Sequence, residues 1–116
     1  MHKDSLDYLR HISDECVYIK SVITSEISKS NFLENETLKR AVIRSLEIIG
    51  EASKKISADL KYRWDTVSWK NMAGMRDRLI HDYMGVDYSI VWDVVKNKIP
   101  ELYEQIEDVI EGESKK

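Results

Sequence analysis

Apolar residues recur at steps of three or four along most of this chain, and this spacing constrains the fold more than any other feature. The first stripe comprises Leu6, Leu9, Ile12, Cys16, Ile19 and Ile23. Such spacing places the side chains on one face of an α-helix, here from about Asp4 to Ser28. The 116 residues include only one proline and four glycines, fewer than strands joined by tight turns would need. The pattern therefore predicts an all-α protein.

Further helices are predicted from caps and stripes. Residues 28–35 are polar and indicate a loop, and Asn35 is placed to cap a second helix. The second stripe comprises Leu38, Ala41, Val42, Ser45, Ile48, Ile49, Ala52 and Ile56. Gly50 lies inside this helix, where close packing would compensate for a cost of about 1 kcal/mol relative to alanine. Residues 57–67 are mixed and predict only a turn or short helix.

The C-terminal half predicts three more helices. One begins at Ser68, ends at Gly85 in the left-handed conformation, and has a stripe of Trp69, Met72, Arg76, Leu79 or Ile80, and Tyr83. Asp87 is placed to cap the next helix, which Pro100 must break or kink. A final helix ends near Gly112. We thus expect residues 1–116 to form a single domain, an antiparallel bundle of four to five helices.

Composition excludes several classes of site. Cys16 is the only cysteine, so no intrachain disulfide or cysteine-based zinc site is expected. Three scattered histidines do not make a metal site either, and we expect no metal and no cofactor. No apolar run approaches the length of a membrane span, and the N-terminus lacks the apolar core of a signal peptide. A cytoplasmic protein without membrane contact is the simplest expectation.

Charge is distributed unevenly although its sum is only −3. Residues 54–78 contain seven Lys or Arg and three acids, a balance of +4, whereas residues 99–116 contain six acids and two lysines, a balance of −4. The positive region leads into the stretch RDRLIHDY at residues 76–83. Lys54, Lys55, Lys61, Arg63 and Lys70 are candidates for a phosphate-binding border, although charge runs are usually solvated surface.

RDRLIHDY brings together groups suited to RNA cleavage. On a helical wheel Tyr83 returns to within about 20° of Arg76, while His81 lies about 140° away. Asp77 and His81 are four residues apart, so the aspartate is a candidate to orient the imidazole. Histidine transfers protons near neutral pH and arginine matches phosphate oxygens. On an ideal helix the two side chains converge only partly, so we expect either a loosened helix end near Gly85 or a second subunit. One histidine and one arginine are also few for the whole reaction, and a two-fold dimer would double them.

The spacing of Arg76, His81 and Tyr83 resembles the R-x(4)-H-x-Y motif of HEPN-domain toxins of the HepT type. The stretches SLEIIGEASKKI at 45–56 and WKNMAGMRDRLIHDYMGVDYSIVW at 69–92 are similar to that family's second helix and signature region. The resemblance implies a HEPN-like bundle, a two-fold homodimer, and a metal-independent endoribonuclease toxin with its site at the dimer interface.

The resemblance also implies roles for single residues. Arg76 and His81 would be catalytic, and Asp77 fits the family's preference for a polar residue after the arginine. Tyr83 would be the residue that a cognate nucleotidyltransferase antitoxin (MntA-like) modifies with AMP, as in type VII toxin–antitoxin pairs. Added phosphates beside the cleft would repel RNA. Arg78 and Lys70 are candidate RNA contacts.

Alternatives remain open from the sequence. The chain could be a non-catalytic partner of a minimal nucleotidyltransferase that binds nucleotide or RNA, because holding and cleaving phosphate both use arginine. It could also be a purely structural dimer in which Arg76 and His81 are solvated helix residues. Tyr83 is in line with Trp69 and Met72 and could belong to the core. Trp64, Trp69 and Trp92 are expected to be core or dimer anchors rather than base-stacking platforms.

Overall fold

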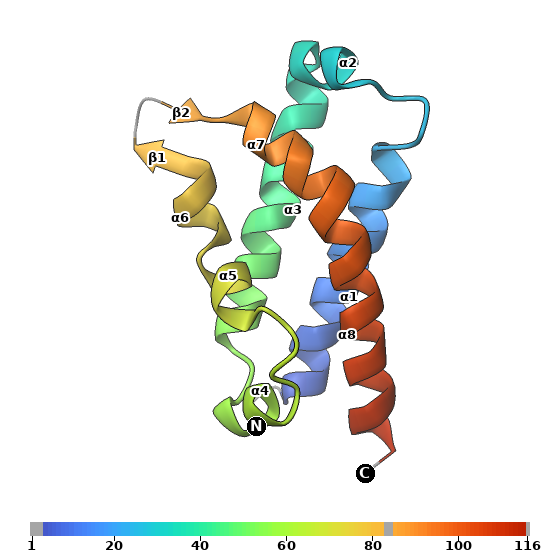
Figure 1. The fold of residues 1–116 in the computed structure, drawn as a ribbon, viewed down its shortest axis with the longest axis vertical. Coiled ribbons are helices and arrows are strands. Elements are labelled where there is room, and N and C mark those ends of the chain that lie inside the picture. Colours follow the sequence, from blue (N-terminus) through green and yellow to red (C-terminus); the bar gives the residue numbers. More distant parts are fainter. Residues whose placement is uncertain (1–3, 83–84, 116) are drawn as a thin grey trace.

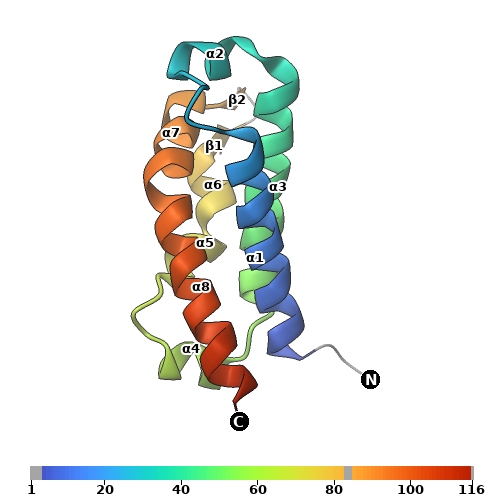
Figure 2. The same ribbon diagram turned by 90° about the vertical axis from the view of Figure 1, so that its right-hand side faces the viewer.

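Helices α1 (Ser5–Val22) and α3 (Glu36–Lys54) run antiparallel along one half of the molecule. The computed structural model describes residues 4–82 and 85–115, except for the side chains of residues 76, 80, 81 and 82. The other half contains α5 (Trp69–Ala73), α6 (Met75–Leu79), α7 (Tyr88–Asp93), the π-helix η1 (Val94–Lys98) and α8 (Ile99–Ser114). The bundle measures 45 × 31 × 27 Å, and α1 begins at the end where α8 finishes (Figure 1, Figure 2). The predicted all-α antiparallel bundle is confirmed.

The predicted stripes form the core. Leu9, Ile12, Cys16 and Ile19 on α1 are fully buried, and α1 packs against both α3 and α8. Val42, Ser45, Ile49, Ala52 and Ile56 of the second stripe are buried as well. Asn35 caps α3 as predicted, because its side-chain oxygen accepts a hydrogen bond from the Leu38 amide at 3.0 Å. Local periodicity and local capping therefore account for the two long N-terminal helices.

Residues 28–35 were predicted to be a loop, and this prediction is wrong. They contain the short helix α2 (Lys29–Glu34), which begins with a capping box between Ser28 and Asn31. The Ser28 hydroxyl accepts from the Asn31 amide at 3.0 Å, and the Asn31 side chain accepts from the Ser28 amide at 3.2 Å. Phe32 on α2 is fully buried, with its ring centroid 5.4 Å from that of Trp92. The cap and this aromatic anchor hold the segment in a helical turn.

The predicted single helix from Ser68 to Gly85 is divided. Gly74 separates α5 from α6, and α6 ends at Leu79 instead of Gly85. The chain then forms two short antiparallel strands, β1 (Ile80–Asp82) and β2 (Gly85–Val86), a hairpin that the helical spacing did not predict. Gly85 has the expected positive φ, of 131°, but it belongs to the hairpin instead of ending a helix. Ser68 occupies the N-cap position of α5 without a side-chain hydrogen bond.

Pro100 does not break the C-terminal helix. Ile99 keeps helical angles (φ −65°, ψ −43°), although a following proline disfavours them. The helix instead widens at η1, where the Ile99 amide donates to the Val94 carbonyl, and α8 continues beyond it. Figure 1 shows the run changing direction between α7 and α8, so the expected kink is present as a bend at a π-helical turn. Asp87 caps α7 as predicted, accepting from the Ser89 and Ile90 amides at 3.1 and 3.3 Å.

A tryptophan clamp joins the segment after α3 to the end of α8. The short helix α4 (Ala58–Arg63), within the expected 57–67 segment, ends at Trp64, whose indole N–H donates to Glu113 at 2.8 Å. Arg63 donates to the same carboxylate at 2.7 and 3.3 Å. The Trp64 ring lies against Gly112, where a Cβ atom would come within 2.4 Å of the ring. Trp64 and Trp69 thus pack against the core, as predicted, and so does Trp92.

We expect Gly112→Ala to lower the free energy of unfolding by about 1 kcal/mol. Alanine favours helix by about 1 kcal/mol, but overpacking against the Trp64 ring costs about 1–3 kcal/mol. Urea denaturation measures the change. In a Trp64→Leu background the obstruction is gone, so the same substitution should become neutral or stabilising. An equal loss in both backgrounds would show that the clamp does not exclude a side chain at residue 112.

Candidate functional site

The predicted catalytic residues lie on two different elements. Arg76 belongs to α6 and His81 to β1, so the end of α6 at Leu79 falls between them. Two backbone contacts connect the end of α6 and the start of β1 to the segment that follows the hairpin turn. Ile80 pairs with Val86, and the Asp87 amide donates a hydrogen bond to the Leu79 carbonyl at 3.3 Å. The side chains of Arg76 and His81, and the whole of Tyr83, lie outside the described residues.

The helical-wheel geometry used for these residues is therefore wrong beyond Leu79. The angles that relate Arg76 to His81 and Tyr83 assume an unbroken helix, and so does the four-residue step from Asp77 to His81. His81 lies instead on extended backbone, where side chains alternate between two faces. The helix end is loosened as expected, but earlier, at Leu79. Asp77 lies on the exposed side of α6, and its orienting role stays a prediction.

Close packing on α3 fixes the position of α5 and α6. A Cβ atom at Gly50 would lie 3.3 Å from the Met72 carbonyl oxygen and 3.7 Å from that of Ala73. The expected close approach at Gly50 is thus confirmed, between the backbones of α3 and α5. Met75 and Leu79 continue the contact on α6, where both are buried. The segment that carries Arg76 is consequently anchored by apolar contacts on both sides of that residue.

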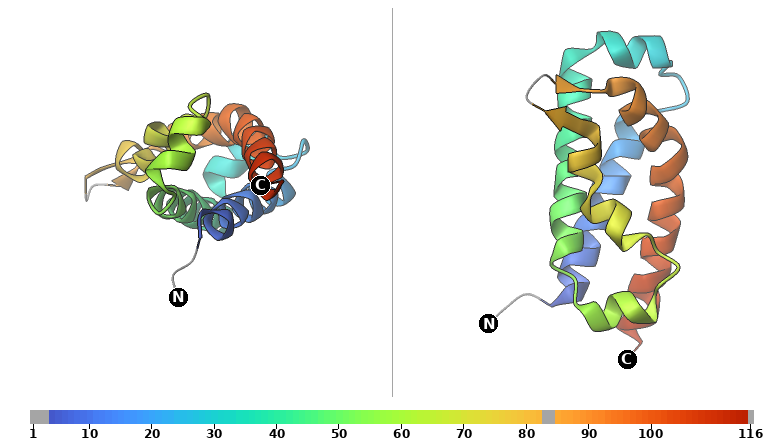
Figure 3. Two further views of the ribbon diagram at one scale, coloured as in Figure 1. Left: turned by 90° about the horizontal axis from the view of Figure 1, so that it is seen from below. Right: turned by 60° about the vertical axis from the view of Figure 1, so that its left-hand side comes forward.

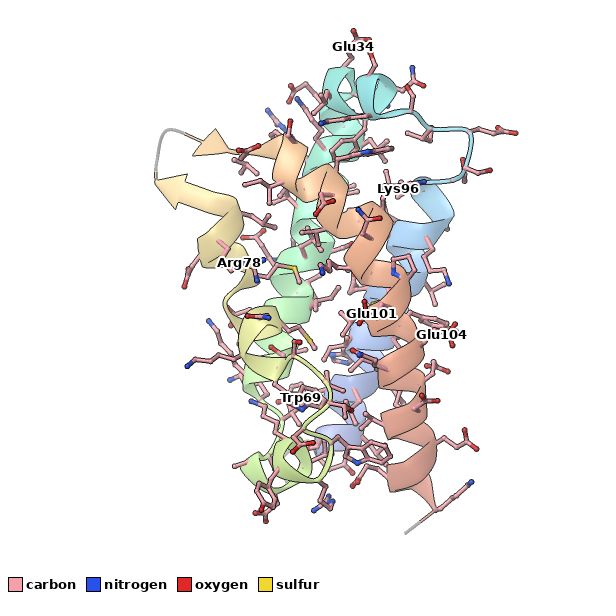
Figure 4. The ribbon with its side chains drawn as sticks, viewed as in Figure 1. Glu34, Trp69, Arg78, Lys96, Glu101 and Glu104 are labelled. Atoms are coloured by element: carbon pink, nitrogen blue, oxygen red, sulfur yellow. The ribbon has the colours of Figure 1, made fainter. Side chains whose placement is uncertain are left out.

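A cavity of about 150 Å³ lies on the other side of α5 and α6, between them and the η1–α8 run. Figure 3 shows α5 and α6 placed between α3 and α8, and Figure 4 shows Arg78 on the side of α6 that faces Glu101. Arg78 and Lys98 line the cavity from opposite walls. Lys98 was not identified from the sequence, because only the fold brings it near α6. Lys70, the other candidate RNA contact, is exposed on α5 but does not line this cavity.

The proposed basic border is divided by local ion pairs. Arg63 is held by Glu113 at the end of the bundle opposite the hairpin, and hydrogen bonding to that carboxylate raises the pKa of Arg63. Lys54 lies 3.5 Å from Glu51 on the same helix. Within the described part of the chain, Arg78 and Lys98 form no such pair. Arg63 and Lys54 are thus partly neutralised by acids, whereas the two cations of the cavity are not ion-paired among the described residues.

Other reactive groups in the described residues are few. Burial raises the pKa of the Cys16 thiol to about 12, so it stays protonated and belongs to the core. Among the residues described, no group of three or more His, Cys, Asp or Glu side chains is placed to hold a metal ion. None of the described helices is both long and apolar enough to cross a membrane.

Comparisons with known proteins agree with the motif. A family model described as "Ribonuclease HepT-like" matches residues 6–109. The chain is 42% identical over 106 residues to "Putative RNase TTE0752" of Caldanaerobacter subterraneus subsp. tengcongensis, covering 91% of this chain and 94% of the relative. It is 42% identical to "Putative RNase MJ0125" of Methanocaldococcus jannaschii, covering 90% and 91%. It is 45% identical to "Probable ribonuclease HepT" of Thermococcus cleftensis, covering 88% and 92%. No solved structure matches the chain.

We expect Gly85→Ala to destabilise the protein by about 1–3 kcal/mol. The φ of 131° at Gly85 is one that side chains rarely adopt, and no atom within 4 Å would touch an added Cβ, so the cost comes from the backbone alone. Gly74→Ala is the matched control, because Gly74 has a φ of −88° and needs no special conformation. Urea denaturation of both variants tests this, and equal stability would contradict the assigned strain.

Proposed function

Because the chain belongs to the HepT-like ribonuclease family, we propose that it is a metal-independent endoribonuclease toxin that cleaves RNA through Arg76 and His81. The observation that carries this proposal is the family match over residues 6–109, which includes the whole R-x(4)-H-x-Y stretch. Relatives named as ribonucleases cover most of the chain, so the likeness is not limited to a short motif.

The proposed reaction uses the nucleophile that RNA itself carries. The 2′-hydroxyl attacks the adjacent phosphorus, its proton passes to a base, and the 5′-oxygen leaves with a proton from an acid. Histidine suits both transfers because its ordinary pKa of about 6.5 lies near working pH. The planar guanidinium of Arg76 would stabilise the charge on the phosphorane oxygens through paired hydrogen bonds.

We assign the second proton carrier to a second copy of the chain. The motif supplies one histidine and one arginine, whereas the reaction needs a base, an acid and positive charge. A two-fold dimer presents the same surface twice, so one shared cleft would contain two copies of each residue. The end of α6 at Leu79 is compatible with this arrangement, because Arg76 and His81 belong to two different elements, α6 and β1.

We further propose control by a cognate nucleotidyltransferase antitoxin that adds AMP to Tyr83, in a type VII-like pair. Tyr83 is two residues after His81 in the sequence and directly follows Asp82, the last residue of β1. Negative phosphate placed so near the reacting phosphodiester would repel RNA. In this scheme Asp77 orients His81, Lys70 and Arg78 contact RNA, and the chain acts as one cytoplasmic domain.

His81→Ala and Arg76→Ala should each lower kcat/KM for RNA cleavage in EDTA by at least about 100-fold, the usual effect of losing a proton carrier or an oxyanion contact. The assay follows cleavage of a labelled RNA by purified protein. His11→Ala and Arg10→Ala are matched controls, because both residues are exposed on α1, and they should retain activity.

Specific activity should also fall on dilution as the dimer dissociates, with the molar mass followed by light scattering. Cleavage that is equal in all variants would remove the roles of Arg76 and His81. Growth arrest and partner binding that both persist in His81→Ala would instead favour the non-catalytic partner.

Incubation with the cognate nucleotidyltransferase and ATP should add one or more AMP groups and abolish cleavage, and Tyr83→Phe should prevent both effects. Intact-mass spectrometry counts the added groups. Tyr62→Phe is the control, because Tyr62 is 84% exposed on α4 and offers an accessible phenol outside the motif. Modification that persists in Tyr83→Phe, or is lost in Tyr62→Phe, would contradict the assignment.

A further inference from the structure

The cavity between α5–α6 and η1–α8 has an apolar floor. Five buried side chains form it, namely Met72, Met75, Val94, Ile99 and Leu102. Methionine is flexible and polarisable and makes favourable contacts with the edges of flat rings. The volume of the cavity, about 150 Å³, is well below the roughly 300–1,000 Å³ of sites for drug-sized ligands. The cavity therefore suits a single ring system.

Polar groups surround this floor and carry a net positive charge. Arg78 and Lys98 contribute two cations, and Glu101 contributes one acid. Ser68, Asn71 and Gln105 add a hydroxyl and two amides, which can both donate and accept hydrogen bonds. Neither cation pairs with an acid among the described residues, so both are available to an anion. A cavity with an apolar floor and a cationic rim matches a nucleotide, which joins a flat base to an anionic phosphate.

The η1 turn shapes one wall of the cavity. Val94 and Lys98 begin and end η1, and both line the cavity. A π-helical turn inserts an extra residue and redirects the side chains around it, and such turns are frequent at functional sites. Arg78 approaches from α6, on which Arg76 lies two residues earlier. The cavity is therefore beside the candidate catalytic segment, although residues 76 and 78 occupy positions about 200° apart around α6.

We propose that this cavity receives one base of the single-stranded RNA substrate, with the adjoining phosphate on Arg78 and Lys98. The assignment rests on the proposed ribonuclease function and adds a base-binding subsite to it. Met72 and Met75 contact the ring, while Asn71, Gln105 and Glu101 meet its edge. Glu101 suits a base with an exocyclic amine, because a carboxylate accepts from such a group. Since the cavity and Arg76 are on different flanks of α6, this base is not one that directly adjoins the scissile phosphate.

The test measures RNA affinity in full-length His81→Ala protein, in which cleavage does not interfere. A short unstructured RNA is prepared with one abasic nucleotide at each position in turn. One position should lose about tenfold in affinity, the usual contribution of a stacked base. Gln105→Trp, which places a large ring at the cavity, should bind the intact RNA about as weakly and show no further abasic effect. Uniform affinity at every position would overturn the proposal.

Salt dependence tests the phosphate contacts. Arg78→Gln and Lys98→Gln should each reduce the slope of log K against log salt by about 0.7, as expected when one contact to single-stranded RNA is lost. Lys96→Gln is the matched control, because Lys96 belongs to the same η1 turn but lies over the Trp92 ring, outside this cavity. If the slope of log K against log salt is the same in Arg78→Gln and Lys98→Gln as in the Lys96→Gln control, the assignment is overturned.

The two proposals fail separately. Wild-type protein that cleaves RNA, with affinity and cleavage unchanged in Arg78→Gln and Lys98→Gln, removes the subsite and leaves the ribonuclease. Wild-type protein that shows the abasic effect without cleaving RNA supports the subsite and removes catalysis. Gln105→Trp that changes the molar mass in solution while leaving RNA affinity intact would assign the cavity to contact between chains, against the proposal.

Discussion

The contact between the backbones of α3 and α5 decides where the candidate site lies. Gly50 leaves room for the Met72 carbonyl oxygen. A Cβ atom added at residue 50 would lie 3.3 Å from that oxygen, closer than most Cβ contacts in proteins. Because α6 begins directly after Gly74, this contact also fixes the start of the helix that carries Arg76. Apolar packing and a glycine contact elsewhere in the chain thus position the helix on which the motif begins.

The fold was predictable where its causes are local. Apolar residues at steps of three or four identified α1 and α3, since the residues that form one buried helical face are near each other in sequence. Asn35 and Asp87 were identified as caps for the same reason, because each accepts from amides two or three residues ahead. The family resemblance was likewise carried by a continuous stretch, and the family match confirms it.

Other features depend on residues far apart in the chain. Phe32 stabilises α2 because the rings of Trp92 and Tyr88 pack against its ring, with centroid distances of 5.4 and 6.4 Å. The end of α6 follows from pairing with β2, which competes with the helix and which helical spacing does not reveal. The cavity depends on Lys98, which faces the same space as Arg78 only through the η1 turn. Neither the hairpin nor the second cation has a local signal that would have found it.

The division of the motif between a helix and a strand has a consequence for how the chain handles RNA. Within α6 the buried residues Met75 and Leu79 form one stripe, and the positions of Arg76 and Arg78 flank it on opposite sides. Asp77 lies on the exposed ridge between them, where its carboxylate disfavours phosphate. The Arg78 flank therefore lines the cavity, and the Arg76 position lies on the other flank. In the proposed scheme, base binding and phosphodiester cleavage would use opposite flanks of one helix, so a substitution on one flank need not remove the chemistry proposed for the other.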